Sequence, residues 1–554
     1  MILNLIIFFA FYLLVFLSTY SYGFILRKYF FKNEISLNEN EFINIFFGIG
    51  FFIVFGWIYH FSGLKNEWLN LSIFIIGGII FFNKKVRPRN LLFFLILPLI
   101  LFSGLVIFKG HNDFHLYHFQ NIIELTDGNP KIGIGNLSVK YIYNSLYVYF
   151  ESILSIPNYK FQFFNIPRFL GFVAICGYLV LNIIEKNNFD KSFISSVILV
   201  FFLLKFRRFS EHGYDYLVIF YTTFIFIEYF YRNLKDQTYL KSILFLFSIT
   251  CAIKVTGLFF LPFIFYIIYK TFYKIKKKFF YKSFFPSFFV GLIFLVNSLL
   301  NSGCIFYPFK ATCFNSNTIP WTVDYKMIDS EKKISSKWAK GFYHQKENPK
   351  ILSYQTYKKN FNWISSWYQS HFKSKILEPC LIFILILYIF YFSSKKTNKN
   401  NFLKYNKVNL ILFLFSILLW LFLLPQFRFG YSFIILFIFL ALSFSFNYEP
   451  KLNKFGFVII ILSLLSFNLS NFQRVKDEFY KNEYFPFYQT IFFKTYSLEN
   501  NQLNYKIYKR NSKGEKISIV NKIFSPQYNL KYNNDYSLKI DTLGYLKIIS
   551  ADIK

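Results

Sequence analysis

The sequence predicts an all-α integral membrane protein, a polytopic helical bundle of about fourteen spans with large extracytoplasmic loops and a small strand-rich C-terminal tail. Three observations predict it. Apolar runs of 15–22 residues recur along most of the 554-residue chain, and a bilayer-spanning helix needs about 20 residues. Clusters of lysine and arginine fall in every second connection between these runs. Polar stretches with strand-like alternation, such as YSLKIDTLGYLKIIS, gather after residue 470.

The apolar runs define a membrane domain over residues 1–470 and leave a tail over residues 471–554. The N-terminal run MILNLIIFFAFYLLVFL lacks a basic start and a small-residue cleavage site, so it is interpreted as the first span. The predicted spans lie near residues 3–24, 42–63, 68–82, 90–108, 163–184, 192–206, 213–231, 240–253, 256–273, 284–300, 376–393, 408–424, 430–447 and 455–470.

The basic connections predict the orientation, because cytoplasmic loops of membrane proteins carry an excess of lysine and arginine. The segments of this kind are RKYFFK, KKVRPR, EKNNFDK, RNLKDQTYLK, KIKKKFFYK, SSKKTNKNNFLKYNK and NYEPKLNK. Their alternation places the N-terminus, the loops 109–162 and 301–375 and the tail outside the cytoplasm. The net charge of +34 is then explained by cytoplasmic loops, and no nucleic-acid partner is predicted.

Two apolar stretches allow alternative interpretations. Residues 240–273 carry Lys254 and Gly257 in the middle, and one long span there would move the lysines of KIKKKFFYK outside. Two short spans are therefore predicted. Residues 141–157 are apolar but flanked by polar segments, and a span there would break the alternation. They are predicted to form an amphipathic helix that lies on the outer surface or dips into it.

The first polar cluster is KGHNDFHLYHFQ, directly after an apolar run. It contains Asp113, His115 and His118, and Glu124 and Asp127 follow in the same loop. A carboxylate here could accept a proton from a substrate hydroxyl. The two histidines are one helical turn apart, and substrate binding through hydrogen bonds is favoured over metal ligation because no stronger ligand pattern accompanies them.

The second polar cluster is KFRRFSEHGYDY, between two predicted spans. Glu211 and Asp215 are four residues apart, which puts both carboxylates on one face of a helix. They could hold a divalent metal or polarise a hydroxyl. The alternative is a helix-capping carboxylate paired with Arg207 or Arg208.

Arginine is rare in this chain, ten of 62 basic residues, yet Arg168, Arg207, Arg208 and Arg428 all lie at predicted outward ends of spans. A guanidinium group binds phosphate through two parallel contacts, which an ammonium group cannot do. These four arginines therefore predict a phosphate-binding site. Snorkelling to lipid headgroups and pairing with local acids remain the alternatives.

The loop 301–375 holds four of the seven tryptophans and has more lysines than acids. Trp363 and Trp367 are one helical turn apart, which fits an interfacial helix or a surface for stacking on a sugar ring. Cys304 and Cys313 share the same loop, and an outside location is oxidising, so a short disulfide is predicted.

These motifs resemble, in order, those of an uncharacterised bacterial family of polytopic proteins that is similar to the GT-C glycosyltransferases. The resemblance covers roughly residues 85–450 and rests on short motifs: Asp113 followed by LYH, then GIGNL and YNSLY, RFSEHGYD, NSLLNSGCIFYPF with IPW, and PQFRFG. GT-C enzymes use polyprenyl-phosphate sugars and place an acid of the first large outer loop at the reaction centre. Asp113 matches that position, but the double-acid pattern is absent because HND has one acid.

The resemblance implies a GT-C-like fold in the bacterial inner membrane and transfer of a sugar from a polyprenyl-phosphate donor to a cell-envelope glycan or lipid acceptor. Asp113, Glu211 and Asp215 are the candidate catalytic residues. The candidate substrate-binding residues are His115, His118, Arg168, Arg207, Arg208, Arg428, Trp363 and Trp367. The alternatives are a lipid-linked glycan polymerase or ligase, a non-catalytic envelope protein and, less favoured, a transporter. Whether a divalent cation takes part stays open.

Overall fold

The structure is a computed structural model of the whole chain. It describes residues 2–31, 40–106, 117–126, 129–143, 145–159, 163–184, 189–210, 213–231, 237–272, 277–343, 353–397, 406–443, 446, 449–482, 498–499, 502–510, 516–524, 536–543 and 546–553.

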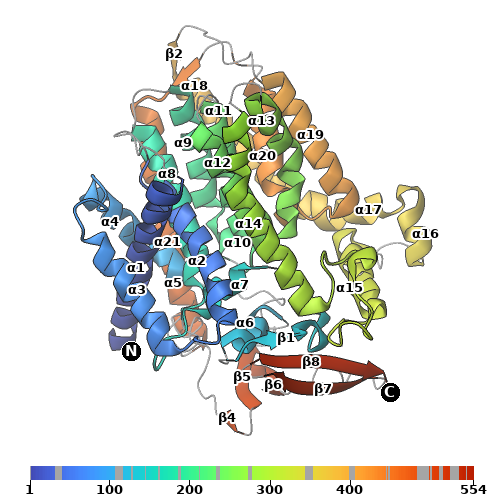
Figure 1. Cartoon of the computed structure of the whole chain (residues 1–554). Coiled ribbons are helices and arrows are strands. Elements are labelled where there is room, and N and C mark those ends of the chain that lie inside the picture. The colour runs from blue at the N-terminus through green and yellow to red at the C-terminus, as the bar shows by residue number, and fades with distance from the viewer. Residues whose placement is uncertain are drawn as a thin grey trace.

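The chain is mostly helical, and a helix occupies each of the fourteen apolar segments singled out in the sequence (Figure 1). Seven helices of the described part are long and apolar enough to cross a membrane by length and composition. These properties are those of a helical membrane protein. The helices are α1 (Ile2–Ile25), α2 (Ile43–Phe61), α3 (Glu67–Phe81), α4 (Leu91–Leu101) continued by α5 (Ser103–Val106), α8 (Ile166–Ile184), α9 (Phe189–Leu204), α11 (Asp215–Tyr231), α12 (Gln237–Ile253), α13 (Leu261–Phe272), α14 (Lys277–Ser302), α18 (Glu378–Ser393), α19 (Asn406–Leu423), α20 (Phe427–Ser443) and α21 (Lys454–Asn482).

Small residues let neighbouring helices approach closely. A Cβ atom added to Gly23 of α1 would lie 1.8 Å from the carbonyl oxygen of Asn44 in α2, and one added to Gly48 would lie equally close to the carbonyl oxygen of Thr19. Glycines at such contacts are typical of helix pairs in membranes, where van der Waals packing drives association. Larger side chains at these positions would force α1 and α2 apart.

The connections between the helices gather at two opposite ends of the bundle. The basic end contains residues 26–31, 82–90, 394–397 and 449–453, where strands β2 (Lys395–Thr397) and β3 (Glu449–Lys451) pair in antiparallel fashion (Figure 1). The Lys241 ammonium donates to the carbonyl of Phe30 at 2.6 Å, which joins the start of α12 to the end of α1. This sorting agrees with the alternation of basic loops in the sequence.

The opposite end, called the loop end here, contains the described residues within the ranges 117–165, 205–214, 303–375 and 424–426. Its short helices are α6 (Phe119–Thr126), α7 (Tyr147–Ser152), α10 (Phe206–Phe209), α15 (Tyr325–Ala339), α16 (Tyr354–Lys358) and α17 (Trp363–Trp367). Hydrogen bonds join these segments across long distances in sequence, for example from the Gly133 amide to the Leu300 carbonyl at 2.7 Å.

The stretch 240–272 forms two helical segments with a break at Lys254, which fits the two short spans predicted. α12 ends at Ile253, Lys254 is extended with φ of −157° and ψ of 134°, and a 3₁₀ turn over Val255–Phe260 leads into α13. Lys254 lies at the loop end beside Asp215. α14 begins only five residues after α13 and runs back to the loop end, so the chain reverses direction at Lys254.

The stretch 141–157 differs from the predicted surface helix. Its one α-helix, α7, has six residues, and all six are buried. α7 packs against α2, α6 and α8. The aromatic and aliphatic residues of the stretch therefore fill the interior of the loop end, where protein packing replaces contact with lipid.

α21 continues to Asn482, past residue 471 where the predicted tail begins. The strands that follow are β4 (Leu498–Glu499), β5 (Gln502–Arg510), β6 (Lys516–Phe524), β7 (Tyr536–Leu543) and β8 (Leu546–Ile553), which fits the strand-rich tail predicted. β4, β5 and β6 form one sheet. β8 pairs with β7 and, in parallel, with β1 (Lys131–Ile132) of the loop end.

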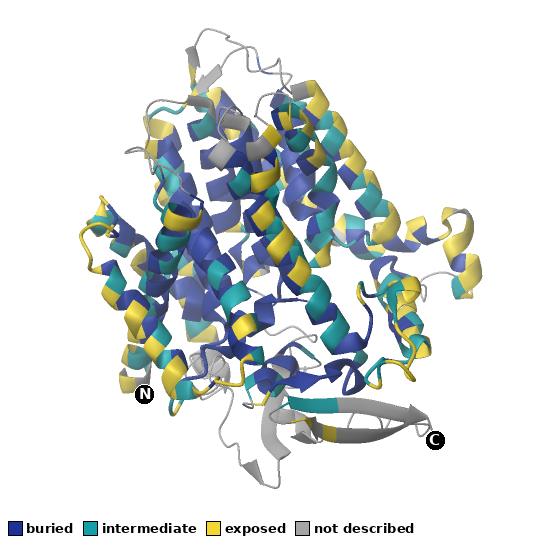
Figure 2. Cartoon of the chain, in the orientation of Figure 1, coloured by how far each residue is buried: buried dark blue, intermediate teal, exposed yellow. Residues whose placement is uncertain are grey.

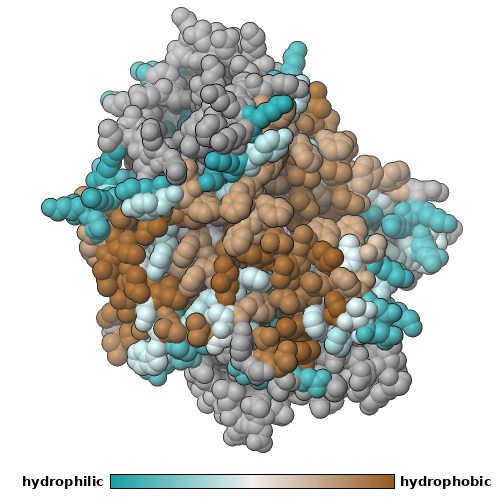
Figure 3. All heavy atoms as spheres, in the orientation of Figure 1, coloured by the Kyte–Doolittle hydropathy of each residue, from teal (hydrophilic) through white to brown (hydrophobic). Residues whose placement is uncertain are grey.

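Burial follows this architecture. Buried residues fill the centre of the bundle, and exposed residues of the described chain lie on outer helix faces and on α15 and α16 (Figure 2). Many exposed side chains of α14, α19 and α21 are large and apolar, such as Phe288, Phe415 and Phe472. Hydrophobic residues form a band across the face of the molecule seen in Figure 3, a surface that a bilayer would cover.

Candidate functional site

Asp215 is the first residue of α11 and lies at the loop end. Gly213 precedes it with φ of +154°, a backbone conformation that L residues rarely adopt, so a glycine suits this entry into the helix. The Asp215 side chain is only 8% exposed. An acidic residue in the first turn of a helix is stabilised by the helix dipole.

Two cations approach the Asp215 carboxylate from different helices. The Lys254 ammonium donates to Oδ1, and Nε of Arg428 lies 3.7 Å from Oδ2. Lys254 lies at the break between α12 and α13, and Arg428 lies in the first turn of α20. The fold therefore brings together residues separated by about two hundred positions.

The same two cations share one aromatic ring. The Lys254 ammonium lies 4.4 Å and the Arg428 guanidinium 5.0 Å from the ring centre of Phe429. A cation over an aromatic face is attracted by the ring quadrupole. Nε of Arg428 also donates to Oε1 of Gln426 at 3.1 Å. Both cations are thus held in position at the mouth of the bundle.

Two cations of this cluster, Lys254 and Arg428, approach the same carboxylate. Lys254 and Arg428 keep side-chain exposures of 26% and 34%, whereas Asp215 is nearly buried. Such a cluster can bind an anion, and a guanidinium group is suited to phosphate. We refer to Asp215, Lys254, Arg428 and Phe429 as the Asp215 cluster.

His118 and Tyr214 extend the cluster toward α6. Tyr214 immediately precedes Asp215, and its ring lies 4.5 Å from the His118 ring in an edge-to-face arrangement. His118 is 5% exposed. Burial raises the pKa of Tyr214 well above its usual value, and the negative charges of Glu151 and Asp215 add to the shift. Tyr214 therefore stays protonated at neutral pH.

Glu151 and Arg168 form a buried layer of ionisable side chains next to Tyr214. Glu151 of α7 is 1% exposed and Arg168, in the first turn of α8, is 2% exposed. Burial raises the pKa of Glu151 well above its usual value, while Tyr147 and Arg168 oppose the shift. A buried acid with a raised pKa beside an arginine is a common feature of functional sites.

The structure describes three of the four arginine side chains that the sequence groups together. Arg428 is part of the Asp215 cluster and Arg168 of the buried layer. Arg207 of α10 is exposed, and it interacts electrostatically with Arg474 of α21. The backbone of Arg208 belongs to α10, but its side chain lies outside the described residues. A shared site of all four arginines therefore stays a prediction.

Three further candidates, Asp113, His115 and Glu211, lie outside the described residues, and so does Asp127 of the first polar loop. Glu124 of that loop pairs with the Lys131 ammonium. Sequence reasoning did not assign Lys254, Tyr214 or Glu151 to the site. The signals were present, since Lys254 interrupts an apolar stretch and Glu151 is the one acid of residues 141–157.

Trp363 and Trp367 are buried, with 3% and 7% exposure, and do not offer open faces to a sugar. The two rings contact each other edge to face at 5.9 Å. Nε1 of Trp367 donates to the Pro425 carbonyl at 2.6 Å. The structure assigns both to packing, and Trp367 ties α17 to the turn that presents Arg428.

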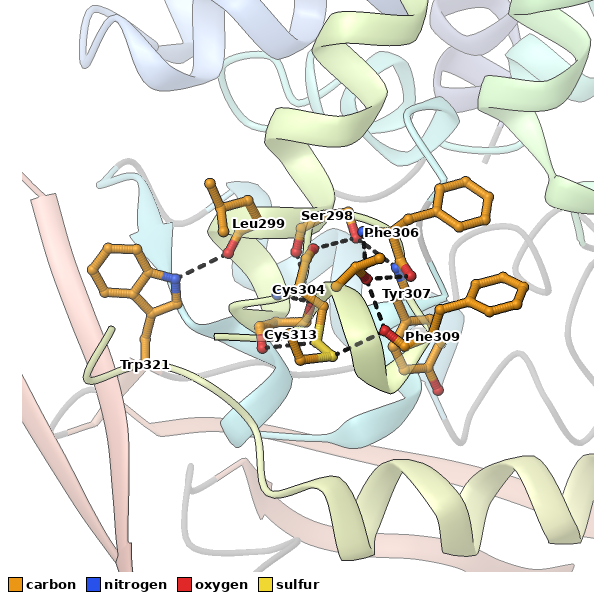
Figure 4. Close-up of a disulfide and its surroundings, with 10 residues drawn as sticks. Ser298, Leu299, Cys304, Phe306, Tyr307, Phe309, Cys313 and Trp321 are labelled. Atoms are coloured by element: carbon orange, nitrogen blue, oxygen red, sulfur yellow. Dashed lines mark hydrogen bonds between the residues drawn. A yellow bond between two sulfur atoms is a disulfide. The ribbon is translucent and has the colours of Figure 1, made fainter. Parts of the chain in front are cut away.

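The predicted disulfide between Cys304 and Cys313 is present in the structure (Figure 4). It closes a small loop after α14, and Nε1 of Trp321 donates to the Leu299 carbonyl at 3.0 Å beside it. The adjoining segment joins the first outer loop, because the Asn136 amide donates to the Trp321 carbonyl at 2.9 Å.

A metal site of three or more His, Cys, Asp or Glu side chains does not occur among the described residues. The pair Glu211 and Asp215 cannot be assessed as a metal site, since Glu211 lies outside that part of the chain.

Comparison with known proteins shows the family. The family model described as Domain of unknown function (DUF8201) matches residues 5–435, which cover α1 to the first half of α20. The chain belongs to this family. Neither a curated protein nor a solved structure matches the chain significantly. The matched region includes the whole Asp215 cluster and excludes the tail.

Proposed function

We propose that the protein is a membrane glycosyltransferase of GT-C type, which transfers a sugar from a polyprenyl-phosphate donor to a glycan or lipid acceptor of the cell envelope. The loop end is proposed to face away from the cytoplasm of a bacterial inner membrane. The observation that supports this proposal is the pair of partly exposed cations, Lys254 and Arg428, held beside Asp215 and Phe429 at the mouth of a bundle whose outer faces are apolar.

The cluster suits the phosphate of a lipid-linked donor. Transfer of the sugar leaves a polyprenyl phosphate, and negative charge grows on the bridging oxygen as the glycosidic bond breaks. Arg428 and Lys254 are positioned to stabilise that charge. Asp215 holds both cations, and because it is paired with them it is the positioning residue in this scheme.

The general base is assigned to Asp113. It would accept the proton of the acceptor hydroxyl as the oxygen attacks the anomeric carbon. The support is positional: His118, five residues later, lies against Tyr214, next to Asp215. This contact holds the end of the HNDFHLYH segment beside the phosphate-binding cations, although Asp113 itself lies outside the described residues.

Lipid analysis of a deletion strain tests the proposal. Loss of the protein should raise the level of one polyprenyl-phosphate sugar and remove one modification from envelope glycans or lipids. Complementation with the native chain should restore both, and Asp113→Asn should restore neither, because a general base contributes about 10²–10⁴-fold. Asp324→Asn, an acid that caps α15, is the matched control and should complement fully.

Membrane abundance of each variant is measured by quantitative blotting, so that a folding defect is recognised. The proposal fails if the deletion changes neither donor lipids nor envelope glycans. If Asp113→Asn is abundant and complements normally, Asp113 is not the base, and Asp215 and Glu211 become the candidates for that role.

A further inference from the structure

A second group of lysines lies in the segment that contains α15, α16 and α17, away from the Asp215 cluster. Lys340 follows the last residue of α15 and is only 6% exposed. Its ammonium lies 5.1 Å from the centre of the Trp363 ring. The Tyr357 hydroxyl donates to the Lys340 carbonyl at 2.7 Å, which fixes the backbone at this position.

Two further lysines lie in the same segment as Lys340. Lys337 is three residues earlier, and its ammonium lies 5.2 Å from the ring centres of both Phe342 and Tyr354. Lys358 is exposed at the end of α16 and follows Tyr357, whose hydroxyl binds the Lys340 carbonyl. The pKa of Lys340 is lowered first by burial and then by repulsion from Lys358. We refer to Lys337, Lys340 and Lys358 as the lysine cluster.

The acidic residues of α15 interact with residues other than the lysine cluster. Asp329 pairs with Lys333 at 2.6 Å, and Oε1 of Glu331 accepts from the Tyr143 hydroxyl at 2.6 Å. None of the three clustered lysines forms an ion pair within the described part of the chain. Aromatic faces hold Lys337 and Lys340, and a buried ammonium without an acid, such as that of Lys340, is costly unless an anion neutralises it.

The lysine cluster lies next to the hydrophobic band. The Phe361 ring, three residues after Lys358, contacts the Phe422 ring at the end of α19 with centroids 6.1 Å apart. Trp338, Phe361 and Ile364 are exposed by 53%, 55% and 45%. Hydrophilic residues adjoin the hydrophobic band on the side of the molecule that carries α15 and α16 (Figure 3).

We propose that Lys337, Lys340 and Lys358 bind the phosphate headgroup of an anionic phospholipid of the surrounding bilayer. Exposed aromatic residues at headgroup depth combined with lysines are the features that favour an anionic lipid surface. Phe361 and Ile364 would contact the upper acyl chains, while the three ammonium groups contact the phosphate. This inference does not depend on the reaction proposed for the Asp215 cluster.

Native mass spectrometry of the full chain in detergent tests the site. Phosphatidylglycerol and phosphatidylcholine are titrated separately, and the dissociation constant of the first bound lipid is compared. The native chain should prefer phosphatidylglycerol. Lys337→Gln combined with Lys340→Gln should weaken phosphatidylglycerol binding by about 25-fold, since each surface lysine contributes about fivefold, and should leave phosphatidylcholine binding unchanged.

The control removes two positive charges from other positions of α15. Lys326 and Lys332 are exposed on α15, so Lys326→Gln combined with Lys332→Gln should change phosphatidylglycerol binding by less than about twofold. An equal loss in both double variants would overturn the proposal, because net charge alone would then explain binding. Equal affinity of the native chain for the two lipids would overturn it as well.

Two further measurements keep the test decisive. Lys340→Arg keeps the charge and should retain the preference for phosphatidylglycerol; loss of the preference in this variant, with an unchanged melting temperature, would contradict the proposal. Inorganic phosphate added at the concentration of the lipid should not displace phosphatidylglycerol. Displacement would show a site for free phosphate, and the lipid assignment would be wrong.

Discussion

The two acids of α11 lie in different surroundings at the two ends of the helical bundle. At the basic end, Glu228 of α11 accepts from the Tyr178 hydroxyl at 2.6 Å and pairs with Lys191 of α9 at 3.2 Å. The Lys191 ammonium also lies 5.3 Å from the Tyr178 ring centre. At the loop end, Lys254 and Arg428 approach Asp215 from two different helical segments.

This difference is the one expected between a structural ion pair and the proposed binding site. Both acids belong to α11, at its opposite ends, and both are nearly buried. The side chain of Lys191 is 18% exposed, whereas those of Lys254 and Arg428 are 26% and 34% exposed. The exposure of the cations therefore distinguishes the two surroundings more clearly than the burial of the acids does.

The strongest test of this comparison replaces each of the two acids of α11 by its amide, in separate variants. Asp215→Asn should reduce the proposed transfer by about 10²–10³-fold, because the phosphate-binding cations lose the group that positions them. Glu228→Gln should leave turnover within about twofold and instead lower stability by about 3–5 kcal/mol, since it breaks a buried pair. Turnover and thermal unfolding of both variants in the same detergent are the measurements. A reversed pattern would contradict the distinction between the two ends.

The disulfide offers a second test, because it fixes the loop end covalently. Cys304→Ser combined with Cys313→Ser should cost about 2–3 kcal/mol of local stability, from the entropy that a short closed loop removes. Proteolysis after α14 should then become faster. Cys380→Ser, at a free cysteine in α18, is the control and should leave proteolysis unchanged. Equal proteolysis of the native and double-serine chains would contradict the expectation.

A substitution of Arg428 tests the comparison at a single side chain. Arg428→Lys keeps the charge beside Asp215 but loses the fork that holds phosphate in two contacts. We expect donor binding to weaken about tenfold or more, the value of one hydrogen bond to a charged group. Lys191→Arg at the basic end is the matched exchange and should have no effect on donor binding. Isothermal titration calorimetry with a polyprenyl phosphate measures the dissociation constant of each variant in detergent.

Lys65 gives the smallest expected effect. It lies between α2 and α3 and donates to the Leu125 carbonyl at 2.7 Å and the Ser152 hydroxyl at 2.8 Å. Burial lowers the pKa of Lys65 to about 7, whereas the unfolded chain keeps the usual value of about 10.4. Between these values the unfolded state binds more protons, so stability rises with pH by at most about 1.4 kcal/mol per unit.

The melting temperature should therefore increase from neutral to alkaline pH in the native chain, and this slope should be smaller in Lys65→Met. Lys85→Met, at an exposed lysine of the basic end, should keep the native slope. If Lys65→Met and the native chain show the same slope between neutral and alkaline pH, the buried lysine is not neutral in the folded state.

Local sequence patterns predict much of the fold. Apolar runs locate the helices, and Lys254 with Gly257 marks the point where α12 ends and the chain reverses. The disulfide follows from two nearby cysteines in one loop. These features depend on neighbouring residues, which is why pattern and charge alone reveal them.

The partners of the site residues depend on tertiary contacts and could not be predicted in the same way. Lys254 is 39 residues from Asp215, and no local pattern links them. Arg207 and Arg428 look equivalent in sequence but lie beside different groups, Arg474 and Asp215. The tryptophan pair has interfacial spacing, yet both rings are buried because α17 folds back onto the turn at Pro425.

The parallel pairing of β8 with β1 has a consequence for biogenesis. Lys547 and Ile548, near the end of the chain, pair with Lys131 and Ile132, and the Lys547 amide donates to the Pro130 carbonyl at 2.9 Å. β8 follows every described helix in the chain, so synthesis reaches the strand that pairs with β1 only after these helices. A nascent chain that stops before β8 would leave β1 without this partner strand, and an unpaired strand edge is a site for pairing with other chains.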